Sequence, residues 1–122
     1  MKKFLVTGGS GFIGTNLMDA FLSQGYQVVN LDSTKPAKSQ HLPYWKQIDI
    51  LDYTGLEAEI TRFDPEVIVH LAAVTDLDGK TADYYNANTK GTQNIVNISK
   101  KLRSLKRVIY TSSMYVCKPG FI

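Results

Sequence analysis

Three glycines with a regular spacing are the residues of this sequence whose pattern most clearly indicates chemistry. Gly8, Gly11 and Gly14 follow a short apolar run and precede a segment of helical period. Gly8 suits a tight turn, Gly11 lets a pyrophosphate approach the backbone, and Gly14 lets the helix pack against the strand. The amino end of that helix would direct its N–H groups at the phosphates. The pattern therefore predicts a turn that binds a dinucleotide.

An acidic residue follows these glycines at the distance that a bound dinucleotide requires. Asp32 closes the second apolar run, 18 residues beyond Gly14. A carboxylate at this position accepts hydrogen bonds from both adenosine ribose hydroxyls and repels a 2′-phosphate, so it favours NAD over NADP. The alternative for Asp32 is a solvated acid at a strand end. Lys35 and Lys38 would partly offset the repulsion, which leaves NADP as the less favoured cofactor.

A parallel sheet is needed to bring these residues together, and the rest of the sequence predicts one. Short β-rich apolar runs alternate with longer segments of helical period, which is typical of successive βαβ units. Right-handed crossovers then predict an α/β domain over residues 1–122, a Rossmann-type doubly wound parallel sheet of about five strands in the order 3-2-1-4-5. The expected strands are Lys3 to Thr7, Gln27 to Leu31, Trp45 to Ile48, Val67 to Leu71 and Arg107 to Thr111. The expected helices are about Phe12 to Gln24, Tyr53 to Arg62 and about Ala82 to Arg103, with a loop over Ser33 to Leu42.

Two residues inside predicted elements require an explanation. His70 could act as a general base, but it lies within an apolar strand, which favours a packed and hydrogen-bonded histidine. Gly91 lies within the third predicted helix, where glycine costs about 1 kcal/mol relative to alanine. We therefore expect Gly91 to allow close packing on the sheet.

Composition and charge exclude several other classes of protein. At 43% hydrophobic residues the chain is neither disordered nor collagen-like, and no apolar run is long enough to span a bilayer. The apolar stretch at Phe4 to Val6 is too short for an export signal. The basic residues are spread along the chain, so we expect no nucleic-acid binding. Cys117 is the sole cysteine, which fits a reducing cytoplasm, and Asp76 and Asp78 lack partners with metal-ligand spacing, so no metal is expected.

Several ordered motifs resemble the extended short-chain dehydrogenases/reductases, the NAD-dependent epimerase/dehydratase family. Thr7 to Gly14, TGGSGFIG, is similar to the TGxxGxxG fingerprint of that family. The resemblance covers essentially all of the chain. The further motifs, in the order of the family, are Asp49-Ile50, His70-Leu71-Ala72-Ala73, Asn88 to Asn94 (NTKGTQN) and Tyr110-Thr111-Ser112-Ser113.

The resemblance implies a function and the residues that perform it. The implied reaction is hydride transfer between NAD and a small-molecule substrate, a nucleotide sugar. Ser113 matches the catalytic hydroxyl that hydrogen-bonds the reacting substrate oxygen, and its alternative is a turn or capping hydroxyl. The implied cofactor contacts are Gly8, Gly11, Phe12, Ile13, Gly14, Asp32, Asp49, Ile50, Leu71, Ala72, Ala73, Asn88 and Thr111.

The sequence departs from the pattern of the family in two places. The family often reads VYG after the serine pair, whereas here Val116 is followed by Cys117-Lys118. The Tyr-x-x-x-Lys motif, which supplies the general acid/base beyond Ser113, does not occur in these 122 residues. Without it the proton transfer has no carrier. We therefore expect an NAD(P)-binding domain over residues 1–122 that is incomplete at its C-terminus, is inactive alone, and binds NAD weakly or not at all.

Other hypotheses remain open. A non-catalytic module that senses NAD(P)(H) and regulates a partner would bind the cofactor tightly as this short chain. A two-chain enzyme would have its missing half encoded separately. In each case the expected last strand, with Val108, Ile109 and Tyr110, would be an unpaired apolar edge, which predicts a homodimer or association through that edge.

Overall fold

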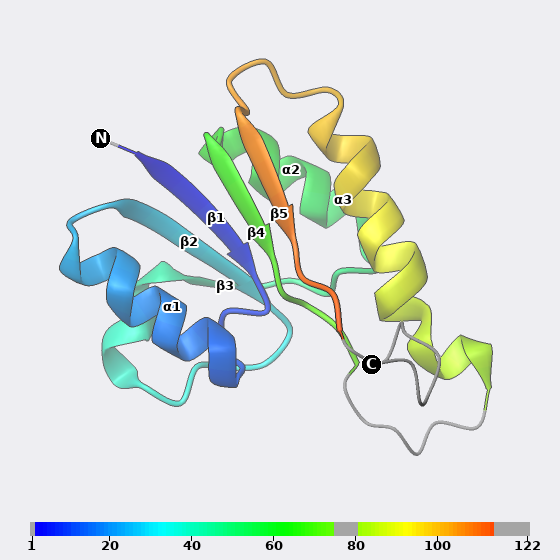
Figure 1. The fold of residues 1–122 in the computed structure, drawn as a ribbon, viewed down its shortest axis with the longest axis horizontal. Coiled ribbons are helices and arrows are strands. Elements are labelled where there is room, and N and C mark those ends of the chain that lie inside the picture. Colours follow the sequence, from blue (N-terminus) through cyan, green and yellow to red (C-terminus); the bar gives the residue numbers. More distant parts are fainter. Residues whose placement is uncertain (1, 75–80, 114–122) are drawn as a thin grey trace, which may run out of the picture.

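The computed structural model describes residues 2–74 and 81–113, which form a parallel five-stranded sheet with helices on both faces (Figure 1). The strand order is β3-β2-β1-β4-β5, which confirms the predicted order and fold class. Cys117, Asp76 and Asp78 lie outside the described residues. The strands are β1 (Lys3–Thr7), β2 (Gln27–Asp32), β3 (Trp45–Gln47), β4 (Val67–His70) and β5 (Arg107–Tyr110). The helices are α1 (Phe12–Ser23), α2 (Tyr53–Phe63) and α3 (Thr92–Ser99), with short 3-10 segments at Ser39–Tyr44 and Ala82–Tyr85 and a π-helical turn at Ala87–Gly91.

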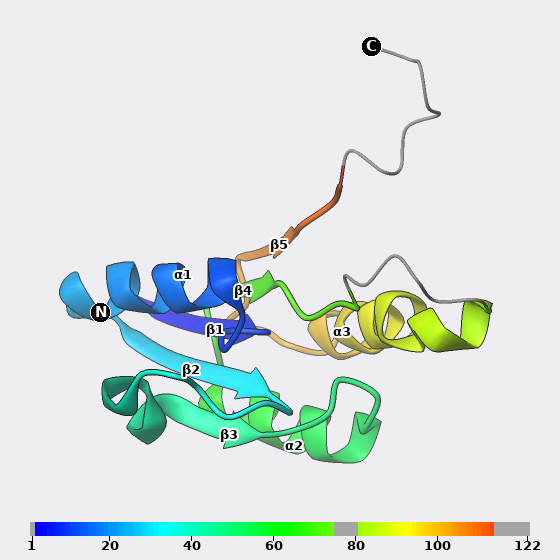
Figure 2. The same cartoon turned by 90° about the horizontal axis from the view of Figure 1, so that it is seen from below.

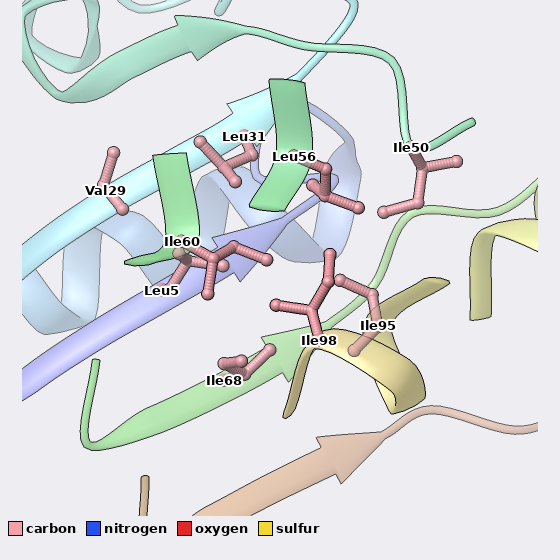
Figure 3. Close-up of a cluster of buried hydrophobic side chains, with 9 residues drawn as sticks. All are labelled: Leu5, Val29, Leu31, Ile50, Leu56, Ile60, Ile68, Ile95 and Ile98. Atoms are coloured by element: carbon pink, nitrogen blue, oxygen red, sulfur yellow. The ribbon is translucent and has the colours of Figure 1, made fainter. Parts of the chain in front are cut away.

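Two apolar layers lie on opposite sides of the sheet, because successive side chains of a strand point to opposite faces. Helix α1 covers one face and α2 and α3 cover the other (Figure 2). On the α1 side, Met18 packs with Val6, Val28 and Val69 from three adjacent strands. The larger cluster, under α2 and α3, contains Leu5, Val29, Leu31, Ile50, Leu56, Ile60, Ile68, Ile95 and Ile98 (Figure 3).

The direction of the chain across the sheet reverses between β1 and β4. From β1 the chain crosses through α1 to β2, whereas from β4 it crosses through α3 to β5 in the opposite direction. Because both crossovers are right-handed, α1 and α3 lie on opposite faces. Thr7 ends β1 and is paired with both Leu31 and His70. The carboxyl ends of β1 and β4 therefore form the switch point at which open α/β sheets bind their ligands.

The structure corrects the predicted continuous helix from about Ala82 to Arg103. Regular α-helix is confined to Thr92–Ser99, and a 3-10 segment and a π-helical turn precede it. The reason is competition from side-chain hydrogen bonds, which weaken a regular helix. The Thr92 hydroxyl donates to the Asn88 carbonyl at 3.0 Å, and the Asn88 side chain exchanges bonds of 2.7 and 3.0 Å with the backbone of Val74.

Gly91 also packs differently from the expectation. A Cβ at this position would lie 2.7 Å from Cγ2 of Ile50, which belongs to the loop after β3. The glycine therefore allows a close approach to Ile50 rather than to a strand of the sheet. The loop predicted over Ser33 to Leu42 likewise contains part of the 3-10 segment Ser39–Tyr44.

Helix α2 ends at a residue with left-handed backbone geometry. Asp64 has φ 54° and ψ 64°, and its N–H donates to the Ile60 carbonyl at 2.9 Å. Glycine adopts this conformation without steric cost, whereas a residue with a Cβ pays about 1 kcal/mol or more, and aspartate is among the more tolerant. Asp64 is exposed, so its side chain contributes little to packing.

We predict that stability follows the order Asp64→Gly, wild type, Asp64→Ala. The two variants should differ by about 1 kcal/mol in the free energy of unfolding, because only the backbone preference changes. Urea denaturation followed by circular dichroism measures this difference. Equal stability of the two variants would show that residue 64 does not hold the left-handed conformation in solution.

Candidate cofactor site

The turn between β1 and α1 is held by its own N–H groups. All four amides from Gly8 to Gly11 donate within the protein, with acceptors at the end of β2 and in the turn itself. The turn therefore has a fixed shape without a ligand. The bonds run from Gly8 to the Leu31 carbonyl (3.1 Å), from Gly9 to Asn30 Oδ1 (2.8 Å), from Ser10 to Asp32 Oδ2 (2.9 Å) and from Gly11 to the Gly8 carbonyl (3.2 Å).

Asn30 on β2 is a structural residue of this turn that the motifs did not identify. It is buried, and besides accepting from Gly9 it donates from Nδ2 to the Ser10 hydroxyl at 3.1 Å. A Cβ on Gly9 would lie 2.5 Å from Asn30 Oδ1, so Gly9 leaves space for the amide. The available signal was an asparagine inside an otherwise apolar strand, because a buried polar side chain requires partners.

The first turn of α1 presents unpaired amides next to the glycine turn. Gly11 is the N-cap residue, and no side chain caps the helix. The first N–H groups of an α-helix have no intrahelical acceptor and form the positive end of its dipole. A Cβ on Gly11 would meet only the Gly8 carbonyl, at 3.5 Å, so the space before the turn is open. The side chains of Phe12 and Ile13 are 86% and 64% exposed at this end.

Close backbone contacts require glycine at the other two motif positions. Gly8 has φ +74°, and a Cβ on it would lie 2.7 Å from the Ala72 nitrogen. A Cβ on Gly14 would lie 2.3 Å from the Gly8 carbonyl oxygen. Gly14 therefore lets α1 pack against the turn and not, as the glycine pattern predicts, against the strand. Gly8 in turn brings the ends of β1 and β4 into backbone contact.

The carboxylate of Asp32 lies at the end of β2, as the sequence predicts. Its two oxygens accept from the amides of Ser10 and Thr34, both at 2.9 Å. A carboxylate oxygen has two lone pairs, so each can accept a further hydrogen bond from a ligand hydroxyl. Asp32 is partly exposed, and Trp45 fixes its backbone by donating from Nε1 to the Asp32 carbonyl at 2.8 Å.

Lys38 is held away from Asp32. Its ammonium bonds to one carboxylate oxygen of Asp19 on α1, and Nε2 of the buried His41 lies 2.7 Å from the other. Lys38, and after it His41, hold the pKa of Asp19 below its ordinary value. Of the two lysines that could favour a 2′-phosphate, Lys38 thus has another partner, and Lys35 is exposed in the loop.

The segment after β4 is anchored by a hydroxyl of β1. The Thr7 side chain is fully buried, and its oxygen accepts from the amides of Leu71 and Ala72, both at 3.1 Å. Its hydroxyl also lies 2.7 Å from Nδ1 of His70, which confirms that His70 is a packed, hydrogen-bonded histidine. Ala73 follows and is exposed. The predicted Leu71–Ala73 contacts therefore lie beside the glycine turn.

Thr111 and Ser113 follow β5 at the same carboxyl edge of the sheet. The Thr111 hydroxyl donates to the His70 carbonyl at 3.2 Å, which ties this segment to β4. Both residues are exposed. Ser113 therefore lies on the side of the sheet where a ligand would bind, as a hydroxyl acting on substrate must.

Three other predicted residues lie nearby but use their side chains differently. Both polar groups of the Asn88 side chain form hydrogen bonds with the backbone of Val74. Ile50 is 8% exposed and belongs to the core under α2 and α3 (Figure 3). Asp49 is exposed, and its Oδ1 accepts from the Leu51 amide at 2.9 Å, which shapes the loop after β3.

Together the sheet order, the glycine turn and the acid at the end of β2 define a Rossmann-type nucleotide-binding fold. The profile described as the NAD dependent epimerase/dehydratase family matches residues 4–120. The chain belongs to this family.

Individual relatives agree with this assignment. The chain is 34% identical to a UDP-glucose 4-epimerase of Mycolicibacterium smegmatis, over 91% of the chain and 38% of the relative. It is 31% identical to a UDP-glucose 4-epimerase of Klebsiella pneumoniae, over 93% of the chain and 91% of the relative. The crystal structure of UDP-glucose 4-epimerase from Brucella ovis in complex with NAD superposes with a TM-score of 0.79 at 28% identity, over 93% of the chain and 36% of that structure. The chain spans 32–41% of the length of four of the curated relatives that it matches.

The described part of the chain has neither a membrane-spanning helix nor a metal-binding cluster. None of its helices has both the length and the apolar character needed to cross a bilayer. Among the same residues, no three His, Cys, Asp or Glu side chains are grouped so as to hold a metal ion.

We predict that Gly8→Ala destabilises the fold far more than Gly25→Ala. Both glycines have nearly the same positive φ, +74° and +75°, but a Cβ on Gly25 meets nothing within 4 Å. Gly25→Ala should therefore cost about 1–2 kcal/mol from the backbone alone, and Gly8→Ala should add a steric cost of similar or larger size. Thermal or urea unfolding measures both. Equal losses would mean that the backbone of Ala72 can withdraw from Gly8.

Proposed function

We propose that this chain is the dinucleotide-binding part of an NAD-dependent nucleotide-sugar epimerase or dehydratase. The proposal rests chiefly on one observation. The amides of the glycine turn are paired with β2 and with the turn itself, while the adjoining first turn of α1 is uncapped and faces open space. Such an arrangement suits an anionic pyrophosphate. Family membership and relatives that bind NAD support the same interpretation.

The residues of the site divide between the parts of the cofactor. The amides of Phe12 and Ile13 would hold the pyrophosphate, with Gly8, Gly11 and Gly14 allowing its approach. Asp32 would accept from the adenosine ribose, which its remaining lone pairs permit. The loop at Asp49 would lie along the adenine, and Leu71, Ala72, Ala73 and Thr111 would line the side of β4 and β5.

Two of the predicted cofactor residues are better supported in an indirect role. Asn88 holds the backbone of Val74, so its side chain would shape the segment that follows Ala73. Ile50 places its side chain in the core, so it would support the adenine loop from below. We propose that both position the site.

The chemistry of the whole enzyme would be shared between this chain and residues that its 122-residue sequence does not contain. NAD supplies the nicotinamide that accepts or donates a hydride. Ser113 would donate a hydrogen bond to the reacting substrate oxygen and hold it in place. The proton would need a Tyr-x-x-x-Lys pair, which does not occur in the sequence. We propose that the domain is incomplete at its C-terminus and inactive alone.

Separate observations support the cofactor preference, the substrate class and the location that we propose. Asp32 repels a 2′-phosphate and Lys38 is engaged by Asp19, so we propose NAD rather than NADP. Relatives solved with UDP or a UDP-sugar support a nucleotide-sugar substrate. The single cysteine of the sequence supports a cytoplasmic location.

We predict weak NAD binding that depends on Gly11. Titration of the isotopically labelled chain with NAD should shift the amide resonances of Gly8 to Ile13 and of Asp32 in NMR spectra. Gly11→Ala should abolish these shifts without loss of stability, because its Cβ enters only the open space before the turn. Gly25→Ala is the matched control, since it should lose stability and keep the shifts.

Several outcomes would contradict the proposal. An absence of shifts at millimolar NAD in the wild type would overturn it for this chain, as would equal shifts with Gly11→Ala. Larger responses to NADP than to NAD would overturn the assignment of Asp32. Tight binding of NAD by the 122-residue chain would favour the sensor module instead.

We also propose that the chain associates through β5. This strand pairs only with β4 among the described elements, and Ile109 and Tyr110 are 44% and 43% exposed. The Ile109 side chain, with Phe4 and Val67, lines a hollow of about 330 Å³ on the α1 side of the sheet. An open strand edge beside an apolar surface promotes pairing with another chain.

We predict that the wild type forms dimers or larger species and that Ile109→Lys shifts it to monomer. The lysine removes apolar surface and introduces a charge that resists burial. Light scattering across a range of concentrations measures the shift. Thr61→Lys, an exposed position on α2, adds the same charge elsewhere and should leave the association unchanged. A wild type that stays monomeric at all concentrations would refute the prediction.

A further inference from the structure

A chain of hydrogen bonds with a buried start at Thr7 and His70 crosses the sheet at the candidate cofactor site. It begins at Thr7 on β1, passes through the imidazole of His70 on β4, and ends at Thr92 and Asn88 beside α3. The Thr7 hydroxyl lies 2.7 Å from His70 Nδ1, and His70 Nε2 lies 3.1 Å from the Thr92 hydroxyl. Thr7 and His70 are 0% and 5% exposed. The bond between Thr7 and His70 is therefore shielded from water, whereas the links to Thr92 and Asn88 lie progressively nearer the surface.

The partners at the two ends fix the direction of every proton in this chain. The single hydroxyl hydrogen of Thr92 is donated to the Asn88 carbonyl at 3.0 Å, so Thr92 can only accept from His70 Nε2. At the other end the Thr7 oxygen accepts from the amides of Leu71 and Ala72, so its hydrogen is left for Nδ1. These partners match a neutral His70 that is protonated on Nε2.

We propose that His70, as a neutral imidazole protonated on Nε2, is a positioning residue that holds the floor of the cofactor site. By taking the hydrogen of Thr7, it turns the lone pairs of that hydroxyl towards the amides of Leu71 and Ala72. Those amides lie where the backbone of β4 meets Gly8, with the Ala72 nitrogen 2.7 Å from the place of a Gly8 Cβ. A change in the protonation of His70 would thus act on the Thr7 hydroxyl, through it on the Ala72 amide, and so on Gly8.

The surroundings of the ring favour its neutral state. The side chains in contact with it are Thr7 of β1, Thr92 of α3 and Tyr110 of β5, whose ring lies edge-on at 6.0 Å, and all three are uncharged at neutral pH. Burial lowers the pKa of His70 below its ordinary value of 6.5. A proton on Nδ1 would place a second donor against the Thr7 oxygen, whose lone pairs are already occupied.

The lowered pKa of His70 determines how stability depends on pH. Because the folded chain binds the proton less readily than the unfolded chain, the contribution of His70 is complete above the ordinary value of 6.5 and decreases as the pH falls below it. On protonation the hydroxyl oxygen of Thr7 must release one of its two amides. The Leu71 amide also donates to the Thr7 carbonyl at 2.9 Å, so the Ala72 amide is the one that depends on the hydroxyl. The floor of the site should therefore loosen in acid.

The first test is the tautomer, measured by NMR of imidazole nitrogens in the full chain. The sequence has two histidines, so in the His41→Gln variant all imidazole signals come from His70. At neutral pH we expect Nε2 protonated and Nδ1 bare, and on acidification the amide resonances of Leu71 and Ala72 should shift with the same midpoint as the ring. A ring protonated on Nδ1, or amides that do not follow the ring, would overturn the proposal.

The second test uses a matched pair of substitutions at the hydroxyl. Thr7→Val removes the hydroxyl but keeps the shape of the side chain, whereas Thr7→Ser keeps the hydroxyl. Thr7→Val should accelerate hydrogen exchange of the Ala72 amide by about tenfold or more and uncouple it from the His70 titration, and Thr7→Ser should restore both. Should Thr7→Val fail to fold, the wild-type titration still decides the matter. Equal exchange in a folded Thr7→Val would refute the role of the hydroxyl.

The part of the inference that concerns NAD rests on the proposed function and has a separate readout. NAD affinity should fall in acid with the midpoint of His70 in the wild type, and this dependence should disappear in Thr7→Val. If NAD does not bind at any pH, the proposed function fails, while the tautomer and the amide titration still decide the role of His70. If NAD binds with no dependence on the titration of His70, the positioning role is overturned.

Discussion

The architecture of the site depends on the close approach of the ends of β1 and β4. Parallel strands end side by side, and beyond the last ladder bond their amides need other acceptors. The Thr7 carbonyl accepts from Leu71 at 2.9 Å, and the Thr7 hydroxyl accepts from both Leu71 and Ala72. Gly8 makes the approach possible, because a Cβ there would collide with the backbone of Ala72. A buried amide without an acceptor costs about 1–3 kcal/mol, so this contact joins the stability of the sheet to the shape of the site.

At the end of β2, side chains likewise accept hydrogen bonds from backbone amides of the site. Asn30 and Asp32 accept from the amides of Gly9 and Ser10 and thereby fix the turn from the side. With the amides of the turn paired in this way, the first turn of α1 has no side-chain cap and is open to the proposed pyrophosphate. Asp32 thus has a structural bond in addition to its proposed contact with ribose. The proposed recognition of the cofactor and the folding of the turn would therefore use the same residue, Asp32.

The two faces of the sheet are unequally covered in the described part of the chain. Under α2 and α3 a large apolar cluster is buried, and its member Ile50 is in close contact with Gly91. On the other face α1 covers β1 and β2, while Ile109 on β5 remains 44% exposed. The chain thus has most of the residues expected to hold a dinucleotide and, in Ser113, a residue expected to touch substrate.

The sequence alone determined the strand order, the position of the glycine turn and the place of Asp32, because these follow from local periodicity and from residue types with narrow backbone preferences. It predicted one long helix where the structure has a π-helical turn and a shorter α3, because the bonds of Asn88 to Val74 come from a distant segment. The partner of Lys38 and the environment of His70 were likewise set by residues far apart in the chain. Only the tertiary structure decides such contacts, since residue spacing does not determine which buried donor meets which acceptor.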